Sequence, residues 1–229
     1  MDEGWTRLTL EQFAFPYTSL KDKEIKKGNL KKNYDVIILP SDSPGMITGD
    51  LPERSRRRMS GYPEEYRSGI GKDGVNNLKQ FVKDGGTLVT LANACEFAIK
   101  EFELDVQDAL DGYSSKEFFC SGSTIKVTFD NTHPLGYGMP DEGVVVFTSS
   151  PAFEIVPGRN NDKYKTVVRY IDKDLLQSGW LIGEKKLAKK AAMVCAQYGA
   201  GRIVLIGFRT QNRFQTHGTF KLIFNTIIQ

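Results

Sequence analysis

The last quarter of the chain constrains the fold more than any other segment. A glycine-containing turn at residues 199–201 leads into an apolar run over residues 203–208, which predicts a buried strand. After a polar loop, a helix starting near Thr216 or Thr219 carries apolar residues on one face, namely Phe220, Ile223, Phe224 and Ile227. This order of elements is typical of α/β domains, whose ligands gather at the carboxyl ends of the strands.

Two further apolar runs predict strands of the same sheet. Residues 34–40 end at a proline, residues 87–92 form the second run, and both are predominantly apolar, as expected of strands covered on two faces. Residues 73–84 come after the first run and residues 95–102 after the second, and both have apolar side chains at helical spacing. Alternating strands and helices imply right-handed crossovers. We therefore expect an α/β fold with a doubly wound, mostly parallel sheet.

The second half of the chain has the sequence pattern typical of β-strands. Alternation of apolar and polar residues recurs from about residue 118, which predicts a β-rich insertion over residues 118–200. Two apolar runs flank residues 198–201, and the glycines between them predict a hairpin. The sheet is therefore expected to gain an added β-rich segment in its C-terminal half.

The N-terminal third is less regular. Residues 3–13 have helical spacing, residues 15–20 predict a short strand, and residues 41–71 form a long loop rich in Gly, Pro, Ser and Arg. A doubly wound domain normally opens with a strand, whereas this chain opens with a helix. We therefore expect residues 1–229 to be a single domain that belongs to a longer protein and lacks its first strand.

Composition argues against several classes of partner and cofactor. The net charge is only +3, and the basic residues 54–58 lie in a predicted loop, so nucleic-acid binding is not expected. The two histidines, His133 and His217, and three scattered cysteines show no zinc-ligand spacing, so no metal site is expected in this chain. No apolar run approaches the roughly 20 residues that cross a bilayer, so no membrane span is expected.

Cys95 is the candidate nucleophile. It follows a buried strand in the first turn of a helix, where the helix dipole lowers a thiol pKa. His217, at the start of the last helix, is the candidate base, although no acid near it completes a triad. The bulky Glu96 and Phe97 depart from the small residues that a nucleophile turn requires. The alternatives are a buried structural cysteine and a histidine that hydrogen-bonds the backbone or a ligand.

Four polar side chains crowd the loop after the predicted strand 203–208. Their amide and guanidinium donors suit a carboxylate or a sugar. The alternative is structural, with the same side chains bracing the loop of residues 41–71. The candidate ligand-binding residues are Arg209, Gln211, Arg213 and Gln215.

Five segments together are characteristic of one family, and the last of them is the most specific: residues 4–13, 15–18, 34–40, 66–71 and 215–225. They resemble the C-terminal glutamine amidotransferase-like domain of bacterial zinc carboxypeptidase-family proteins. The resemblance covers nearly the whole chain. It implies a flavodoxin-like α/β fold whose first strand lies upstream of Met1, and an exported parent protein, periplasmic or extracellular, with a separate metallopeptidase domain.

The chemistry of that family is not carried over with the resemblance. Zinc is expected only in the peptidase domain, since this chain has no matching ligand motif and no cofactor of its own. The amidotransferase histidine and glutamate expected after the last strand are replaced by Arg209, Thr210 and Gln211. An amidase needs both a thiolate and a base, so the resemblance implies a degenerate catalytic site.

Three functions remain open on this basis. The first is a non-catalytic accessory domain that docks on the peptidase domain of the same polypeptide, or binds a peptide or glycan at the strand ends. The second is a ThiJ/PfpI-like or amidotransferase-like cysteine hydrolase that uses Cys95 and His217. The third is a stand-alone sugar- or anion-binding module. We favour the first.

Overall fold

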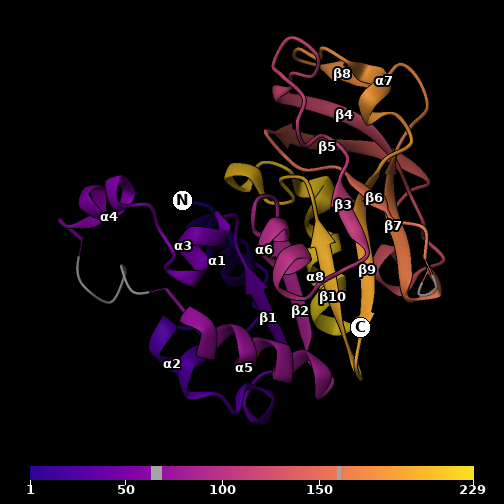
Figure 1. Cartoon of the computed structure of the whole chain (residues 1–229). Coiled ribbons are helices and arrows are strands. Elements are labelled where there is room, and N and C mark those ends of the chain that lie inside the picture. The colour runs from indigo at the N-terminus through magenta and orange to yellow at the C-terminus, as the bar shows by residue number, and fades with distance from the viewer. Residues whose placement is uncertain (63–68, 159–160) are drawn as a thin grey trace.

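The computed structural model describes residues 1–62, 69–158 and 161–229, and a mixed sheet runs through the molecule (Figure 1). Its strands are β1 (Val36–Leu39), β2 (Thr87–Leu91), β3 (Val106–Asp108), β4 (Ser121–Phe129), β5 (Glu142–Thr148), β6 (Phe153–Ile155), β7 (Tyr164–Tyr170), β8 (Leu176–Ser178), β9 (Ala191–Tyr198) and β10 (Gly201–Ile206). Along the sheet the order is β1-β2-β10-β9-β7-β4-β5, and β3, β6 and β8 pair beside this path.

Helices cover both faces of the parallel end of this sheet. The α-helices are α1 (Asp2–Gln12), α2 (Asp22–Lys27), α3 (Pro44–Thr48), α4 (Glu53–Met59), α5 (Gly71–Lys83), α6 (Ala94–Glu101), α7 (Glu184–Leu187) and α8 (Phe220–Ile228). Short 3₁₀ helices are η1 (Leu30–Lys32), η3 (Pro134–Gly136), η4 (Asn161–Lys163), η5 (Asn212–Phe214) and η6 (His217–Thr219). In the part of the chain that the structure describes, no helix has the length and apolar character needed to cross a membrane.

Parallel pairing joins β1, β2 and β10. Val89 at the centre of β2 lies opposite Ile38 of β1 on one side and Val204 of β10 on the other. From β10 onward the sheet is antiparallel, through β9, β7, β4 and β5. The antiparallel strands come from the part of the sequence in which alternating apolar and polar residues predicted β-structure. They lie to one side of the α/β body (Figure 1).

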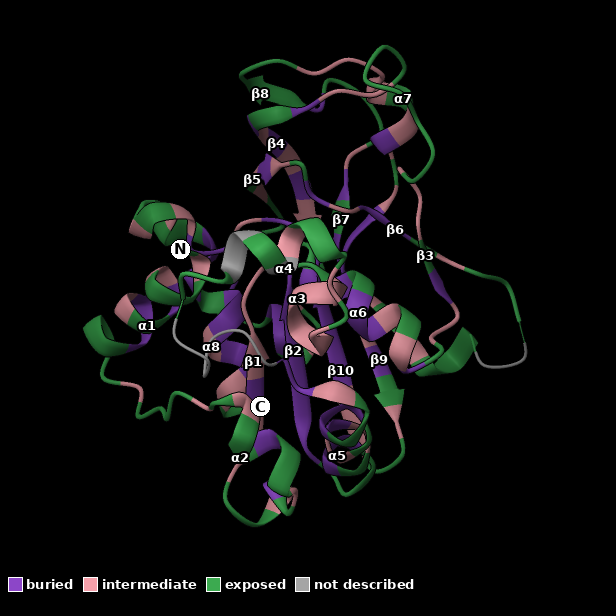
Figure 2. Cartoon of the chain, turned by 60° about the vertical axis from the view of Figure 1, so that its left-hand side comes forward, coloured by how far each residue is buried: buried purple, intermediate pink, exposed green. Residues whose placement is uncertain are grey.

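The apolar runs of the central strands reflect burial on both faces. Every residue of β2 is buried, and Figure 2 shows β2 and β10 buried along most of their length. Leu88 and Leu205 join the core formed with α5 and α6. Their neighbours Val89 and Val204 point the other way, into the core that includes Leu222 of α8. Side chains of a strand alternate between faces, so a doubly covered strand is mostly apolar; the two threonines of β2, Thr87 and Thr90, are buried with the rest.

The predicted hairpin between β9 and β10 is confirmed. Tyr198 pairs with Gly201 across the turn. Gly199 has φ +61°, and a Cβ there would lie 2.7 Å from the Cα of Lys83 at the end of α5. Glycine is needed because the turn is left-handed and because it abuts that helix.

Two expectations for the N-terminal third change. Residues 15–20 form no strand; Phe15 instead stacks on Phe224 of α8, with ring centroids 4.8 Å apart. The aromatic run therefore packs on a helix and does not extend the sheet. The segment expected as a long loop, residues 41–71, contains the short helices α3 and α4. Residues 63–68 of that segment, which include part of the motif at 66–71, lie outside the described residues.

Candidate functional site

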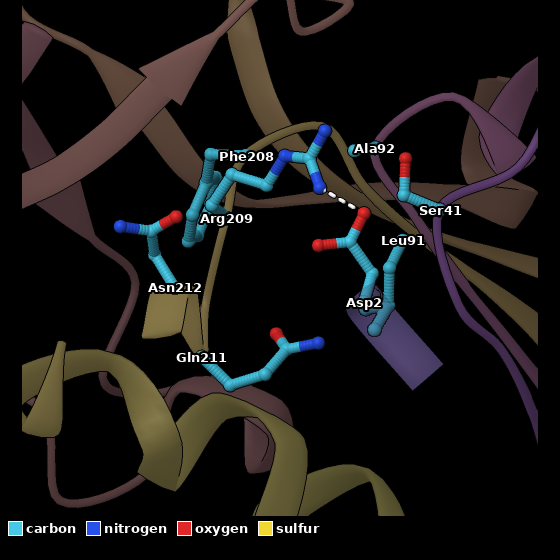
Figure 3. Close-up of a pocket in the computed structure, with 8 residues that line it drawn as sticks. All are labelled: Asp2, Ser41, Leu91, Ala92, Phe208, Arg209, Gln211 and Asn212. Atoms are coloured by element: carbon cyan, nitrogen blue, oxygen red, sulfur yellow. Dashed lines mark hydrogen bonds and ion pairs between the residues drawn. The ribbon is translucent and has the colours of Figure 1, made fainter. Parts of the chain in front are cut away.

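A small pocket lies where the parallel strands end (Figure 3). Ser41 follows β1, Ala92 follows β2 and Arg209 follows β10, so all three come from the carboxyl edge at which α/β folds bind ligands. Asp2, at the start of α1, covers the pocket from above the strand ends. Its volume of about 10 Å³ is room for about one water molecule. The strand ends therefore meet as expected, but α1 leaves little space between them.

Ala92 occupies the turn between β2 and α6. Its φ of +47° is in the left-handed region, which is uncommon for a residue with a side chain. Its N–H donates to the carbonyl of Ile206 at the end of β10, at 2.7 Å. A sharp strand-to-helix turn of this kind is where α/β hydrolases present their nucleophile. Here the residue at that turn is an alanine, which has no nucleophilic atom.

Cys95 lies further into α6 and faces the core. Its side chain is 0% exposed, and its Sγ donates to the carbonyl of Thr90 at 3.3 Å and accepts from the Thr90 hydroxyl at 3.4 Å. Burial raises the pKa of the Cys95 thiol to about 12. The expected effect of the helix N-terminus, a lowered thiol pKa, is outweighed by desolvation, so the group stays a neutral thiol. The structure thus places Cys95 as a packing residue.

His217 is not brought to Cys95. It is exposed on η6, and its ring packs beside two aromatic side chains, with centroids 5.2 Å from that of Phe214 and 4.8 Å from that of Phe220. Within the described residues no hydrogen bond joins His217 to Cys95. A base must lie within hydrogen-bond reach of the proton that it removes, so this geometry supplies no catalytic pair.

Arg209 and Gln211 hold α1 in place. The Arg209 guanidinium forms an ion pair with Asp2, drawn as a dashed line in Figure 3. Gln211 is 5% exposed; its amide donates to the Thr6 hydroxyl at 2.8 Å, and its carbonyl accepts from Thr210 at 2.5 Å. The structural alternative from the sequence was that these side chains brace residues 41–71. In the structure Arg209 and Gln211 contact α1 instead.

The other two candidate ligand residues point elsewhere. Arg213 and Gln215 are both exposed, and neither lines the pocket at the strand ends. Arg213 and Phe214 have φ values of +50° and +57°, so the backbone of η5 turns sharply between them. The four residues predicted as one ligand-binding group are therefore divided into a buried pair and an exposed pair.

Asp2 and Ser41 are among the pocket residues that were not predicted from the sequence. Asp2 lies at the opposite end of the chain from Arg209, and no local pattern connects the two. Ser41 had a signal, since it directly follows the proline that ends the first apolar run. Among the described residues, no three His, Cys, Asp or Glu side chains are grouped as metal ligands would be. His133 lies in a turn, where its Nδ1 accepts from the N–H of Leu135 at 3.2 Å.

Gln211→Ala is expected to lower the free energy of unfolding by about 1–2 kcal/mol. The change leaves the buried hydroxyl of Thr210 and the Thr6 hydroxyl without their amide partner. Gln215→Ala, an exposed glutamine of the same loop, is the matched control and should stay within about 0.5 kcal/mol. Urea unfolding of both variants, with hydrogen exchange of the α1 amides, checks this. Equal effects would show that Gln211 does not anchor the helix.

Comparison with known proteins finds likeness in structure but not in sequence. No family model matches the chain, and no curated protein matches it. A protein of Bacteroides uniformis, provisionally described as ThuA-like, aligns with 97% of this chain and 80% of its own, at 13% identity and a TM-score of 0.54. A cytoplasmic protein of Salmonella typhimurium aligns with 97% of this chain and 84% of its own, at 15% identity and a TM-score of 0.55.

A third structure extends the same likeness. A Thermoplasma acidophilum protein, provisionally described as part of a GMP synthase, aligns with 97% of this chain and 85% of its own, at 12% identity and a TM-score of 0.55. The predicted fold class is confirmed: the chain has the flavodoxin-like α/β fold of class I glutamine amidotransferase-like proteins, and ThuA-like proteins are among its structural neighbours. At these identities the likeness concerns the fold alone.

Proposed function

We propose that this chain is a non-catalytic accessory domain built on an amidotransferase-like fold. The observation that carries the proposal is Ala92, which stands at the strand-to-helix turn where a nucleophile would be expected. Beside it, the guanidinium of Arg209 is paired with Asp2 through its Nη1. Among the described residues that line the pocket there is no cysteine and no histidine, and α1 covers it.

The domain serves a zinc carboxypeptidase-like parent in this proposal. Its work is to dock on the metallopeptidase domain of the same polypeptide, zinc is bound only by that domain, and the parent is exported. Docking is favoured over peptide or glycan binding at the strand ends, because a pocket of about 10 Å³ admits neither. The proposal rests on the sequence resemblance for the parent and on the closed pocket for the mode of action.

The two alternatives have less support. A cysteine hydrolase would need a reactive Cys95, yet the Cys95 thiol is enclosed and its pKa is raised to about 12. A sugar- or anion-binding module at the strand ends would need Arg209 and Gln211 free, yet both are engaged with α1. Each alternative therefore requires α1 or α6 to move before any ligand can bind.

An activity assay separates the accessory domain from the hydrolase. The chain is incubated with glutamine and with small amides, and ammonia release is followed for the wild type and for Cys95→Ser. We expect both proteins to match the buffer. Hydrolysis by the wild type that disappears in Cys95→Ser would overturn the non-catalytic assignment.

The sequence of the gene that encodes the parent protein tests the proposed docking partner. The reading frame that contains this chain is expected to encode a zinc-ligand motif in a neighbouring peptidase domain. When that domain and this chain are produced separately and mixed, co-elution on size exclusion is the expected result. A reading frame without zinc ligands, or independent elution of the two parts, would contradict the docking role and leave the activity result standing.

A further inference from the structure

A second and larger cavity lies beyond the closed pocket, where β3 and β5 end. Its volume is about 350 Å³, within the range of pockets that hold small molecules. Two carboxylates face it, from Asp108 and Asp111, and no basic side chain is among the described residues that line it. Its aromatic wall is made of Tyr113, Phe118, Phe119 and Phe147. The cavity therefore combines negative charge with apolar surface.

The backbone fixes the carboxylate of Asp108. Its Oδ1 accepts from the N–H of Leu110 at 3.0 Å and from the N–H of Ala152 at 3.1 Å. Burial raises the pKa of Asp108 in spite of these bonds, and the charges of Asp111 and Glu96 add to the rise. In the described ranges no lysine, arginine or histidine forms an ion pair with this side chain. A cation placed in the cavity would supply the missing counter-charge.

Tyr170 is a buried polar residue that packs next to the cavity wall. Its side chain is 0% exposed, and within the described residues its hydroxyl has no hydrogen-bond partner. The ring packs edge-on against Phe147, with centroids 6.0 Å apart. Burial raises the pKa of Tyr170, and the charges of Cys120 and Asp108, two cavity residues, raise it further. Tyr170 thus packs behind Phe147, which lines the cavity.

The rim already holds an ammonium group. The Nζ of Lys186 lies 3.4 Å from the centroid of the Tyr113 ring, close enough for a cation–π interaction. Tyr113 also lines the cavity, so the aromatic wall is suited to a cation from the chain itself. An anion, by contrast, would face two carboxylates with no basic residue lining the cavity in the described part of the chain.

We propose that this cavity binds an alkylammonium group, with Asp108 as its fixed counter-charge and the aromatic wall packing against its alkyl part. The ammonium donates to the carboxylate, while the rings interact with the cation and exclude water from the aliphatic chain. A free small amine and a lysine side chain of a peptide share this chemistry. The site is separate from the closed pocket at the strand ends, so it does not depend on the accessory role.

Titration by NMR of the whole chain tests the site directly. The probes are n-butylamine, n-butanol and butyrate, which match in size and differ in charge. We expect saturable shifts of the Leu110 and Ala152 amides with n-butylamine alone, because both amides bond to Asp108. Tighter binding of Nα-acetyl-lysine amide than of n-butylamine would identify a peptide lysine as the source of the ammonium, and the reverse order would identify a small amine.

Charge-neutral variants give the decisive comparison. Asp108→Asn keeps a carbonyl for the two amides and should weaken n-butylamine binding about tenfold, and Asp111→Asn, which is exposed, about threefold. Glu142→Gln, at the opposite end of β5, should leave the affinity unchanged. The proposal is overturned if n-butanol or butyrate binds as well as the amine, if no probe shifts those amides, or if Asp108→Asn binds within twofold of the wild type.

Discussion

Cys95 in the folded protein should react with iodoacetamide at least about 1000-fold more slowly than Cys95 in the unfolded chain. Only the thiolate reacts, and a rise in pKa from 9.0 to about 12 lowers the thiolate fraction about 1000-fold at any pH below 9. Burial at 0% exposure adds a barrier to the reagent itself. The measurement follows alkylation at pH 8 with and without urea, by peptide mass mapping.

The pH profile supplies the control for this prediction. In urea the rate should rise up to about pH 9 and then level off, whereas in the folded state it should still be rising at pH 11. Cys95→Ser removes the signal of the site and leaves that of Cys120 and Cys195, whose pKa values burial also raises. Rapid alkylation of folded Cys95, with a pKa below the 9.0 taken for the unfolded chain, would restore the hydrolase hypothesis.

The fold could be predicted because its strands carry a physical signature. Residues 34–40 and 87–92 are mostly apolar, since every residue of β2 is buried and β1 pairs beside it, and the glycines at 199 and 201 mark a turn that no other residue fits. The strand expected at 15–20 failed for a reason that periodicity cannot reveal. Its aromatic side chains found partners on α8, and a short apolar run does not state whether its neighbour is a strand or a helix.

The sequence indicated that the candidate residues lie at the strand ends, but it did not indicate which side chains contact one another there. The loop after β10 does face the ends of β1 and β2, because parallel strands place their carboxyl ends on one edge. Cys95 lies three residues beyond the strand-to-helix turn, which closes at Ala92 with a positive φ and a hydrogen bond to Ile206 on another strand. The role of Arg209 depends on Asp2, and a contact between the two ends of a chain has no local signal.

Phe220→Ala is expected to lower the free energy of unfolding by about 3–5 kcal/mol, the usual range for a buried phenylalanine. Its ring is 1% exposed and lies where the start of α8 meets the residues after β10 and the end of α1. The centroids of Phe214 and His217 are 5.2 and 4.8 Å from it, and that of Phe13 is 6.0 Å away. Removing the ring opens a cavity that three separate segments line, so no single shift can refill it.

Phe13→Ala is the matched control, because the same cluster holds this ring at 48% exposure. Phe13→Ala should lower the free energy of unfolding by less than half as much as Phe220→Ala, since much of the removed surface was already in water. Urea unfolding at pH 7 gives both values, and the slope with denaturant shows whether the native state stays compact. Equal losses would mean that the cluster belongs to α1 and not to the core. The helix that closes the strand ends would then be held by Phe13 rather than by Asp2 and Thr6.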